Sequence, residues 1–273
     1  MQPSQENNMA AGTPVVFVHG LWLHADSWGP WVDLFRETGY QPSAPGWPGD
    51  LGTVAEAREK PESVAGHGIN DVVEHYAQII GTLDAKPIVI GHSFGGLIAQ
   101  RLLGQDLAAA AVGIDAAPIK GVIYLPPSAL RVASIALKNP ANRNHAVSLT
   151  QKQFRYGFGN ALTAEESDQL HERWNIPSPA KPLFEAAAAN LSPHSPAKVD
   201  TANAKRGPLL LTAGGNDHTV PASITRSTHK LYRKSPAVTD VKELPGRGHS
   251  LTIDNGWREV ADVVLDWLKS NSL

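Results

Sequence analysis

The segment Lys86–Gln100 has the sequence KPIVIGHSFGGLIAQ. It begins with a β-branched run that indicates a buried strand and ends with an apolar run that indicates a helix. Between the two runs, Gly91 and Gly95 flank Ser93 at two positions on either side, which predicts a sharp turn where strand and helix approach closely. We expect this turn to strain the backbone of Ser93 and to expose its hydroxyl group at the tip.

The pattern Gly-x-Ser-x-Gly is not specific by itself, because a glycine-rich turn between a strand and a helix can also bind phosphate. The Gly-Lys-Ser/Thr ending typical of phosphate loops is missing from this segment. The strand before the turn and the helix after it are the surroundings that a nucleophilic serine requires. The sequence therefore favours Ser93 as a nucleophile.

A serine hydroxyl is a weak nucleophile at neutral pH, so a histidine base and an orienting carboxylate must be supplied from elsewhere in the chain. Asp217 and His249 lie in the loops that follow two strand-like segments, Pro208–Ala213 and Val238–Leu244. Asp115 also lies at a predicted strand end and is the alternative carboxylate. Asp217 is favoured because Thr-Val-Pro follows it and leads into a predicted helix.

Two backbone N–H groups are predicted to bind the oxyanion of an acyl-transfer reaction. Leu21 follows Gly20 at the end of a predicted strand, Thr13–Val18, and Phe94 follows the serine at the start of its helix. His19 is expected to hold this loop through a hydrogen bond to backbone rather than to take part in the chemistry.

The alternation of strands and helices is interrupted between residues 126 and 205. Strand patterns disappear there, and the predicted helices are Ser128–Leu137, Thr150–Phe158, Thr163–Trp174 and Pro182–Leu191. This block predicts a helical cap (126–205) inserted into a core formed by residues 13–125 and 206–273, preceded by a disordered tail (1–12). The residues expected to line the substrate pocket are Trp22, Trp47, Phe154 and Phe158.

Composition restricts the kinds of function. The 273 residues include no cysteine, which excludes disulfides and thiolate metal sites, and the formal net charge of −2 gives no reason to expect nucleic acid as a partner. No metal-ligand cluster or cofactor motif is found. The polar amino terminus lacks the pattern of a secretory signal, and no apolar stretch reaches the roughly 20 residues that span a bilayer. We therefore expect a cytoplasmic protein, either a monomer or a homodimer, without cofactor or metal.

His19-Gly20, the turn around Ser93, Asp217 and His249 together resemble the α/β-hydrolase superfamily in order and context. The resemblance implies an α/β fold with a mostly parallel sheet of about six strands, helices on both faces and an inserted cap. It also implies serine-dependent hydrolysis of an ester or a related acyl bond. Many members begin with an antiparallel strand pair, for which the residues before the first predicted strand leave no room.

The superfamily contains many chemistries, and individual residues narrow the choice. Ser93 excludes the aspartate nucleophile of dehalogenases and epoxide hydrolases, and Ser250 stands where hydroxynitrile lyases carry a lysine. The favoured function is hydrolysis of carboxylic esters with small to medium apolar groups. The alternatives are an acyltransferase, a cofactor-free perhydrolase or haloperoxidase-type activity, and a non-catalytic relative that binds a small ligand.

Overall fold

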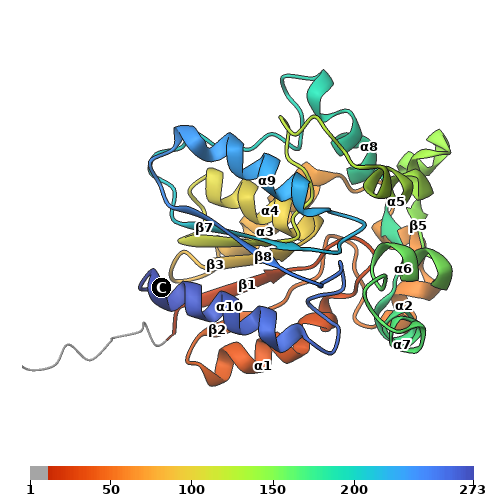
Figure 1. Cartoon of the computed structure of the whole chain (residues 1–273), viewed down its shortest axis with the longest axis horizontal. Coiled ribbons are helices and arrows are strands. Elements are labelled where there is room, and N and C mark those ends of the chain that lie inside the picture. Colours follow the sequence, from red (N-terminus) through yellow and green to blue (C-terminus); the bar gives the residue numbers. More distant parts are fainter. Residues whose placement is uncertain (1–11) are drawn as a thin grey trace, which may run out of the picture.

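A sheet of six parallel strands forms the centre of the molecule, in the order β2-β1-β3-β4-β7-β8. The computed structural model describes residues 12–273 (Figure 1). The strands of this sheet are β1 (Pro14–Val18), β2 (Gln41–Ser43), β3 (Ile88–His92), β4 (Ala110–Ile114), β7 (Leu209–Gly214) and β8 (Thr239–Leu244). The expected parallel sheet of about six strands is confirmed. The expected tail falls, apart from Gly12, outside the described residues.

Helices cover both faces of the sheet (Figure 1). The alternation of side chains along a strand explains the two layers: Val15 and Phe17 belong to one apolar core, whereas Val16 and Val18 belong to the other. The helices are α1 (Gly29–Glu37) and α10 (Trp257–Ser270) on the first face, and α3 (Ile69–Ile80), α4 (Phe94–Gly104) and α9 (Ala222–Leu231) on the second. Burial on both faces is why the strands are almost uniformly apolar.

The block between β4 and β7 lies at one end of the sheet (Figure 1). Its helices are α5 (Pro127–Leu137), α6 (Gln151–Gly157), α7 (Ala164–Trp174) and α8 (Lys181–Ala187), close to the four predicted segments. It also contains an antiparallel pair, β5 (Ala146–Val147) and β6 (Ser178–Pro179), which the sequence did not predict. Strands of two residues are too short to produce a recognisable alternation.

Shorter elements complete the fold. The helix α2 (Val54–Glu59) lies at the same end of the sheet as α6 and α7 (Figure 1). Single 3₁₀ turns cover Ala25–Trp28, Pro61–Val64, Pro140–Asn144, Ala189–Leu191 and Tyr232–Lys234. They connect the longer elements and leave the sheet as the rigid framework of the molecule.

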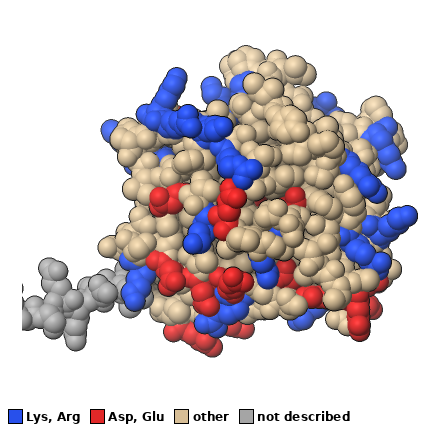
Figure 2. Space-filling view, viewed as in Figure 1, with Lys and Arg blue, Asp and Glu red and all other residues tan. Residues whose placement is uncertain are grey.

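The surface carries charges of both signs. In Figure 2, acidic side chains gather in the lower part of the view and basic side chains are spread over the upper and right-hand parts. This mixture agrees with a formal net charge of −2. Over residues 12–273, every helix is too short or too polar to cross a membrane.

Candidate active site

Ser93 occupies the sharp turn between β3 and α4 and has a strained backbone, with φ 55° and ψ −121°. Its N–H donates to Ile114 O at 2.9 Å, and its carbonyl accepts from Ala117 N at 2.8 Å, so both of its backbone groups are bonded to neighbouring segments. A Cβ on Gly91 would lie 2.0 Å from Gly95 O, which only a glycine avoids. The turn therefore depends on close backbone packing around the serine.

Asp217 and His249 are hydrogen-bonded to each other, with 2.6 Å between Asp217 Oδ2 and His249 Nδ1. They follow the neighbouring strands β7 and β8, and both side chains are fully buried. The other carboxylate oxygen, Asp217 Oδ1, accepts the N–H groups of Thr219 at 2.6 Å and Val220 at 2.9 Å. Burial acts to raise the pKa of Asp217, but the His249 imidazole and these hydrogen bonds outweigh it and lower the pKa overall.

His92, the residue before Ser93, connects the serine turn to His249. His92 Nε2 donates to His249 O at 2.9 Å, and the two ring centroids are 4.6 Å apart. Burial and the neighbouring His249 lower the pKa of His92 well below its usual range, so His92 stays neutral at pH 7. His249 Nε2 is buried and has no hydrogen-bond partner among the described residues. It is the atom with which this imidazole can accept a proton.

The loop after β1 passes directly beside the serine. A Cβ on Gly20 would lie 2.7 Å from Ser93 Cβ and 3.4 Å from Ser93 Oγ. Leu21 is the residue that follows Gly20 in this loop, and Phe94 is the first residue of α4. Trp22 has a φ of 69°, so the chain turns sharply just beyond Leu21. Leu21 and Phe94, whose N–H groups are predicted to bind the oxyanion, thus lie in the two segments that meet at the serine.

His19 is held by contacts with Trp47 and Asp50. Its Nε2 lies 2.8 Å from Asp50 Oδ2, and its ring stacks on Trp47 with centroids 5.5 Å apart. Trp47 Nε1 donates to His19 O at 3.0 Å, and Trp47 N donates to the same Asp50 oxygen at 2.7 Å. These bonds fix the loop that carries Leu21. Trp47 serves this network and does not line the cavity described next.

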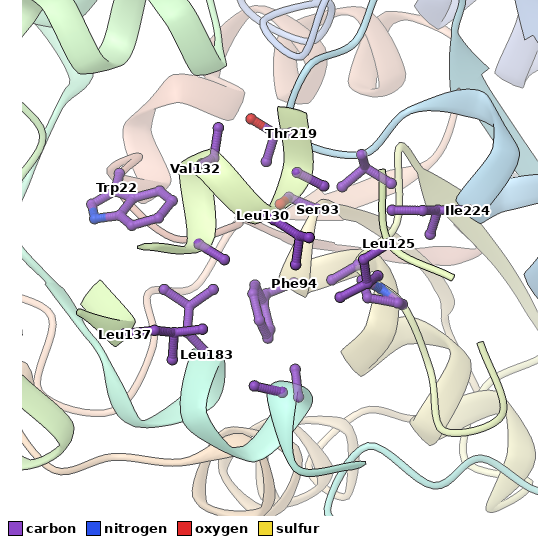
Figure 3. Close-up of a pocket in the computed structure, with 17 residues that line it drawn as sticks. Trp22, Ser93, Phe94, Leu125, Leu130, Val132, Leu137, Leu183, Thr219 and Ile224 are labelled. Carbon is purple, nitrogen blue, oxygen red and sulfur yellow. The ribbon is translucent and has the colours of Figure 1, made fainter. Parts of the chain in front are cut away.

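A cavity of about 220 Å³ opens beside Ser93 (Figure 3). Ser93 and Thr219 are the only polar residues among those that line it, and none of them is charged. The labelled apolar walls are Trp22, Phe94, Leu125, Leu130, Val132, Leu137, Leu183 and Ile224. The site therefore has a reactive hydroxyl at the edge of an apolar space.

Phe154 and Phe158 lie outside the lining of this cavity, in contrast to the sequence-based expectation. Their rings stack with centroids 4.9 Å apart, and both side chains are buried. Phe158 packs edge-on against His249, with 4.8 Å between the ring centroids. Phe158 thus packs against the histidine and Phe154 packs against Phe158, while the cavity wall comes from other parts of the block.

Sequence reasoning missed the residues of α5 and α8 that form this wall. Leu130, Ala133 and Leu137 line the cavity from one stripe of α5, and Leu183 faces them from α8. The helical spacing of the α5 residues could have indicated a shared face. The sequence offers Asp115 as the alternative carboxylate, and the structure places it in the same buried cluster as Asp217.

Solved structures share this architecture. A monoacylglycerol lipase of Paleococcus ferrophilus has a TM-score of 0.66 and 21% identity, with 95% of this chain and 96% of the lipase covered. A pyrethroid hydrolase from Sphingobium faniae JZ-2 has a TM-score of 0.64 and 18% identity over 94% and 98% of the chains. An extracellular alpha/beta-hydrolase from a Paenibacillus species has a TM-score of 0.66 and 19% identity over 93% and 98%. At such identities the likeness concerns the fold.

Among curated proteins, none matches the sequence. A profile described as the alpha/beta hydrolase family matches residues 15–263, which is nearly the whole of the chain. The matched region includes the six-stranded parallel sheet, the turn at Ser93 and both of the later residues, Asp217 and His249. The chain therefore belongs to the alpha/beta hydrolase family.

Proposed function

We propose that this protein is a serine hydrolase that cleaves carboxylic esters, or related acyl bonds, of small to medium apolar substrates. One observation carries the proposal. Ser93 lies in a strained turn at the edge of an apolar cavity, and the residue before it is bonded to a buried histidine that Asp217 holds at 2.6 Å. Nucleophile, base and carboxylate are the groups that acyl transfer requires.

In the proposed reaction, Ser93 Oγ attacks the carbonyl carbon of the ester while His249 Nε2 takes its proton. Asp217 keeps the Nδ1 proton in place, so that Nε2 is the basic nitrogen. The N–H groups of Leu21 and Phe94 bind the oxyanion. The tetrahedral intermediate then expels the alcohol, which receives the proton from His249. Water repeats the sequence on the acyl-enzyme and releases the carboxylic acid.

The cavity supports an apolar substrate. A charged group would lose its hydration there without gaining a charged partner, since none of the lining residues is charged. We propose that the block of α5 to α8 acts as a cap over the strand ends. Its part in substrate choice rests on Leu130 and Leu137 from α5 and Leu183 from α8, which contribute to the cavity wall.

Labelling with a fluorophosphonate tests the proposal. We expect one adduct per chain, mapped to Ser93, together with turnover of p-nitrophenyl butyrate. Ser93→Ala should abolish both, and a matched change of an exposed serine at the end of α10, Ser270→Ala, should affect neither. Absence of an adduct in correctly folded protein would favour the non-catalytic ligand-binding alternative. Excess hydroxylamine or hydrogen peroxide, added as a competing nucleophile, separates hydrolysis from acyl transfer and perhydrolysis.

A further inference from the structure

A second carboxyl group lies behind Asp217. Asp115 directly follows β4, the strand that pairs with β7, and its side chain is fully buried. Its φ of 44° is in the left-handed region, which is uncommon for a residue other than glycine. Such conformations persist only where the surrounding structure enforces them, and they gather at functional sites. The surrounding structure therefore holds the backbone of Asp115 in an unfavourable conformation, as is typical of residues at functional sites.

Asp115 is part of one cluster with the two residues of the proposed triad. One carboxylate oxygen of Asp115, one of Asp217 and one ring nitrogen of His249 lie within 4.8 Å of one another. The carboxyl groups of Asp115 and Asp217 are thus close neighbours in a buried site. Two ionised carboxylates so close together in a buried site would repel each other, which favours a proton on one of them.

The hydrogen-bond donors around each group show which carboxyl holds the proton. Asp217 accepts three: the N–H groups of Thr219 and Val220, and Nδ1 of His249. Within residues 12–273, Asp115 accepts only the N–H of Gly214, shared between its two oxygens at 3.0 and 3.1 Å. Hydrogen bonds to a carboxylate favour its charged form. The charge therefore stays on Asp217 and the proton on Asp115.

The electrostatics agree with this assignment. Burial, followed by the charge of Asp217, raises the pKa of Asp115 well above its usual range. Arg247 acts in the opposite direction but more weakly, and its guanidinium is itself bonded to Asp254. The Gly214 N–H also favours ionisation, and it is outweighed as well.

We propose that Asp115 is a positioning residue whose protonated carboxyl donates a hydrogen bond to Asp217 and holds that carboxylate against His249 Nδ1. Asp115 is absent from the lining of the cavity beside Ser93, so it acts through Asp217 and does not touch substrate. Its effect on turnover rests on the proposed esterase function. The proton on Asp115 and the geometry that it enforces do not.

The first experiment compares Asp115→Asn with Asp115→Leu. Asparagine keeps a neutral donor, whereas leucine has a similar volume and no donor. For p-nitrophenyl butyrate, we expect Asp115→Asn to keep kcat within about twofold of the parent, and Asp115→Leu to lose about tenfold in kcat with little change in KM, as for loss of one buried hydrogen bond. Thermal unfolding of each variant corrects the rates for folded protein.

The pH profile separates the neutral acid from an ionised one. If Asp115 is neutral, Asp115→Asn changes no charge, and the acidic limb of kcat/KM stays where it is. A shift of this limb to lower pH would mean that Asn had removed a negative charge beside His249, and it would overturn the proposal. Equal kcat for Asp115→Leu and the parent would also overturn it.

A second experiment does not depend on turnover. Infrared spectra of Ser93→Ala at neutral pH should contain the carbonyl band of a protonated carboxylic acid, and Ser93→Ala/Asp115→Asn should lack it. The downfield proton resonance of the His249–Asp217 hydrogen bond should persist in the Asn variant and change in the Leu variant. If the band is missing, the inference is wrong; if the band is present in a protein that cleaves no ester, only the proposed function fails. Inactivation by EDTA that a divalent cation reverses would overturn the inference, because the cluster would then hold a metal.

Discussion

The backbone of Ser93 is held in a conformation that costs a residue other than glycine on the order of 1 to 3 kcal/mol. Hydrogen bonds that the Ser93 backbone donates to Ile114 O and accepts from Ala117 N offset this cost, and the flanking Gly91 gives the helix room to approach. The result is a hydroxyl group fixed at the cavity before any substrate arrives. Such preorganisation reduces the ordering that the reaction itself must supply.

Removing this hydroxyl gives the first prediction. Ser93→Ala should lower kcat for p-nitrophenyl butyrate on the order of 10³-fold or more, because the attacking atom is lost. Its thermal midpoint should match that of the parent, since the hydrogen bonds in the turn are made by backbone. A variant that folds normally and keeps most of the turnover would remove Ser93 from the proposed mechanism.

The two buried carboxyl groups should differ in their effect on rate. Asp217→Asn should lower kcat on the order of 10⁴-fold, because an amide favours the wrong imidazole tautomer. Asp115→Asn should change it far less, since Asp115 does not contact the imidazole nitrogen that Asp217 binds. The measurement is kcat for both variants at one pH. The opposite ranking would make Asp115 the orienting carboxylate.

The proton on Asp115 should also affect stability. In the unfolded chain Asp115 ionises above about pH 3.9, whereas its raised pKa keeps it protonated in the folded state. The folded state then binds one more proton, so this group stabilises it fully at low pH and less as pH rises towards the folded pKa. The variant Asp115→Asn has no ionisable group at this position, so it does not lose this stabilisation as pH rises.

Denaturant unfolding of the parent and Asp115→Asn at a series of pH values measures the effect. The difference in unfolding free energy should move in favour of the variant by about 1.4 kcal/mol per pH unit from about pH 4 upwards, until the folded group ionises. Taking the difference cancels the opposite contribution of His92, whose pKa is lowered in the folded state. A constant difference across this range would show that Asp115 is ionised when folded.

At the scale of elements, α5 and α8 pack against each other and contribute Leu137 and Leu183 to the cavity wall (Figure 3). Leu137→Phe or Leu183→Phe should fill part of the space and move the preference among p-nitrophenyl esters towards shorter acyl chains. Leu191→Phe, at a position 87% exposed and outside the cavity lining, is the matched control. An unchanged ranking of short and long esters in both cavity variants would place the acyl group elsewhere.

Phe154 and Phe158 call for a different expectation from the one that sequence suggested. Both are buried outside the cavity, so Phe154→Ala should cost roughly 3 to 5 kcal/mol of unfolding free energy through the space it leaves. The ranking of esters should stay that of the parent.

The strands and helices were largely predictable, and the walls of the site were not. Apolar runs such as Ile88–Ile90 mark buried strands because local pattern and burial agree there. The turn around Ser93 was predictable from Gly91 and Gly95, which flank the serine. Which aromatic residues face the cavity depends on how α5, α6 and α8 are rotated against the sheet, and no local pattern contains that angle. The sequence presents Asp115 and Asp217 as alternatives, because it cannot show that the pairing of β4 with β7 brings the two carboxyl groups close together.

At the scale of the whole molecule, two apolar cores enclose the sheet, and residues distant in sequence complete each of them. Trp31 of α1 donates its indole N–H to Thr252 O at 2.9 Å, which ties the first helix to the segment after His249. The candidate site thus lies where the early and late parts of the chain are joined.

In the proposed mechanism, the strand order β2-β1-β3-β4-β7-β8 also determines when Ser93 becomes reactive during folding. Ser93 leaves the ribosome long before His249, which follows β8 at the far edge of the sheet. Pairings between segments so distant in sequence form slowly. In the proposed mechanism, a growing chain therefore carries an unactivated serine until the last strand docks. In refolding of the denatured protein, we expect fluorophosphonate reactivity to return with the slowest phase of tryptophan fluorescence; recovery in an earlier phase would show that Ser93 is activated before the sheet is complete.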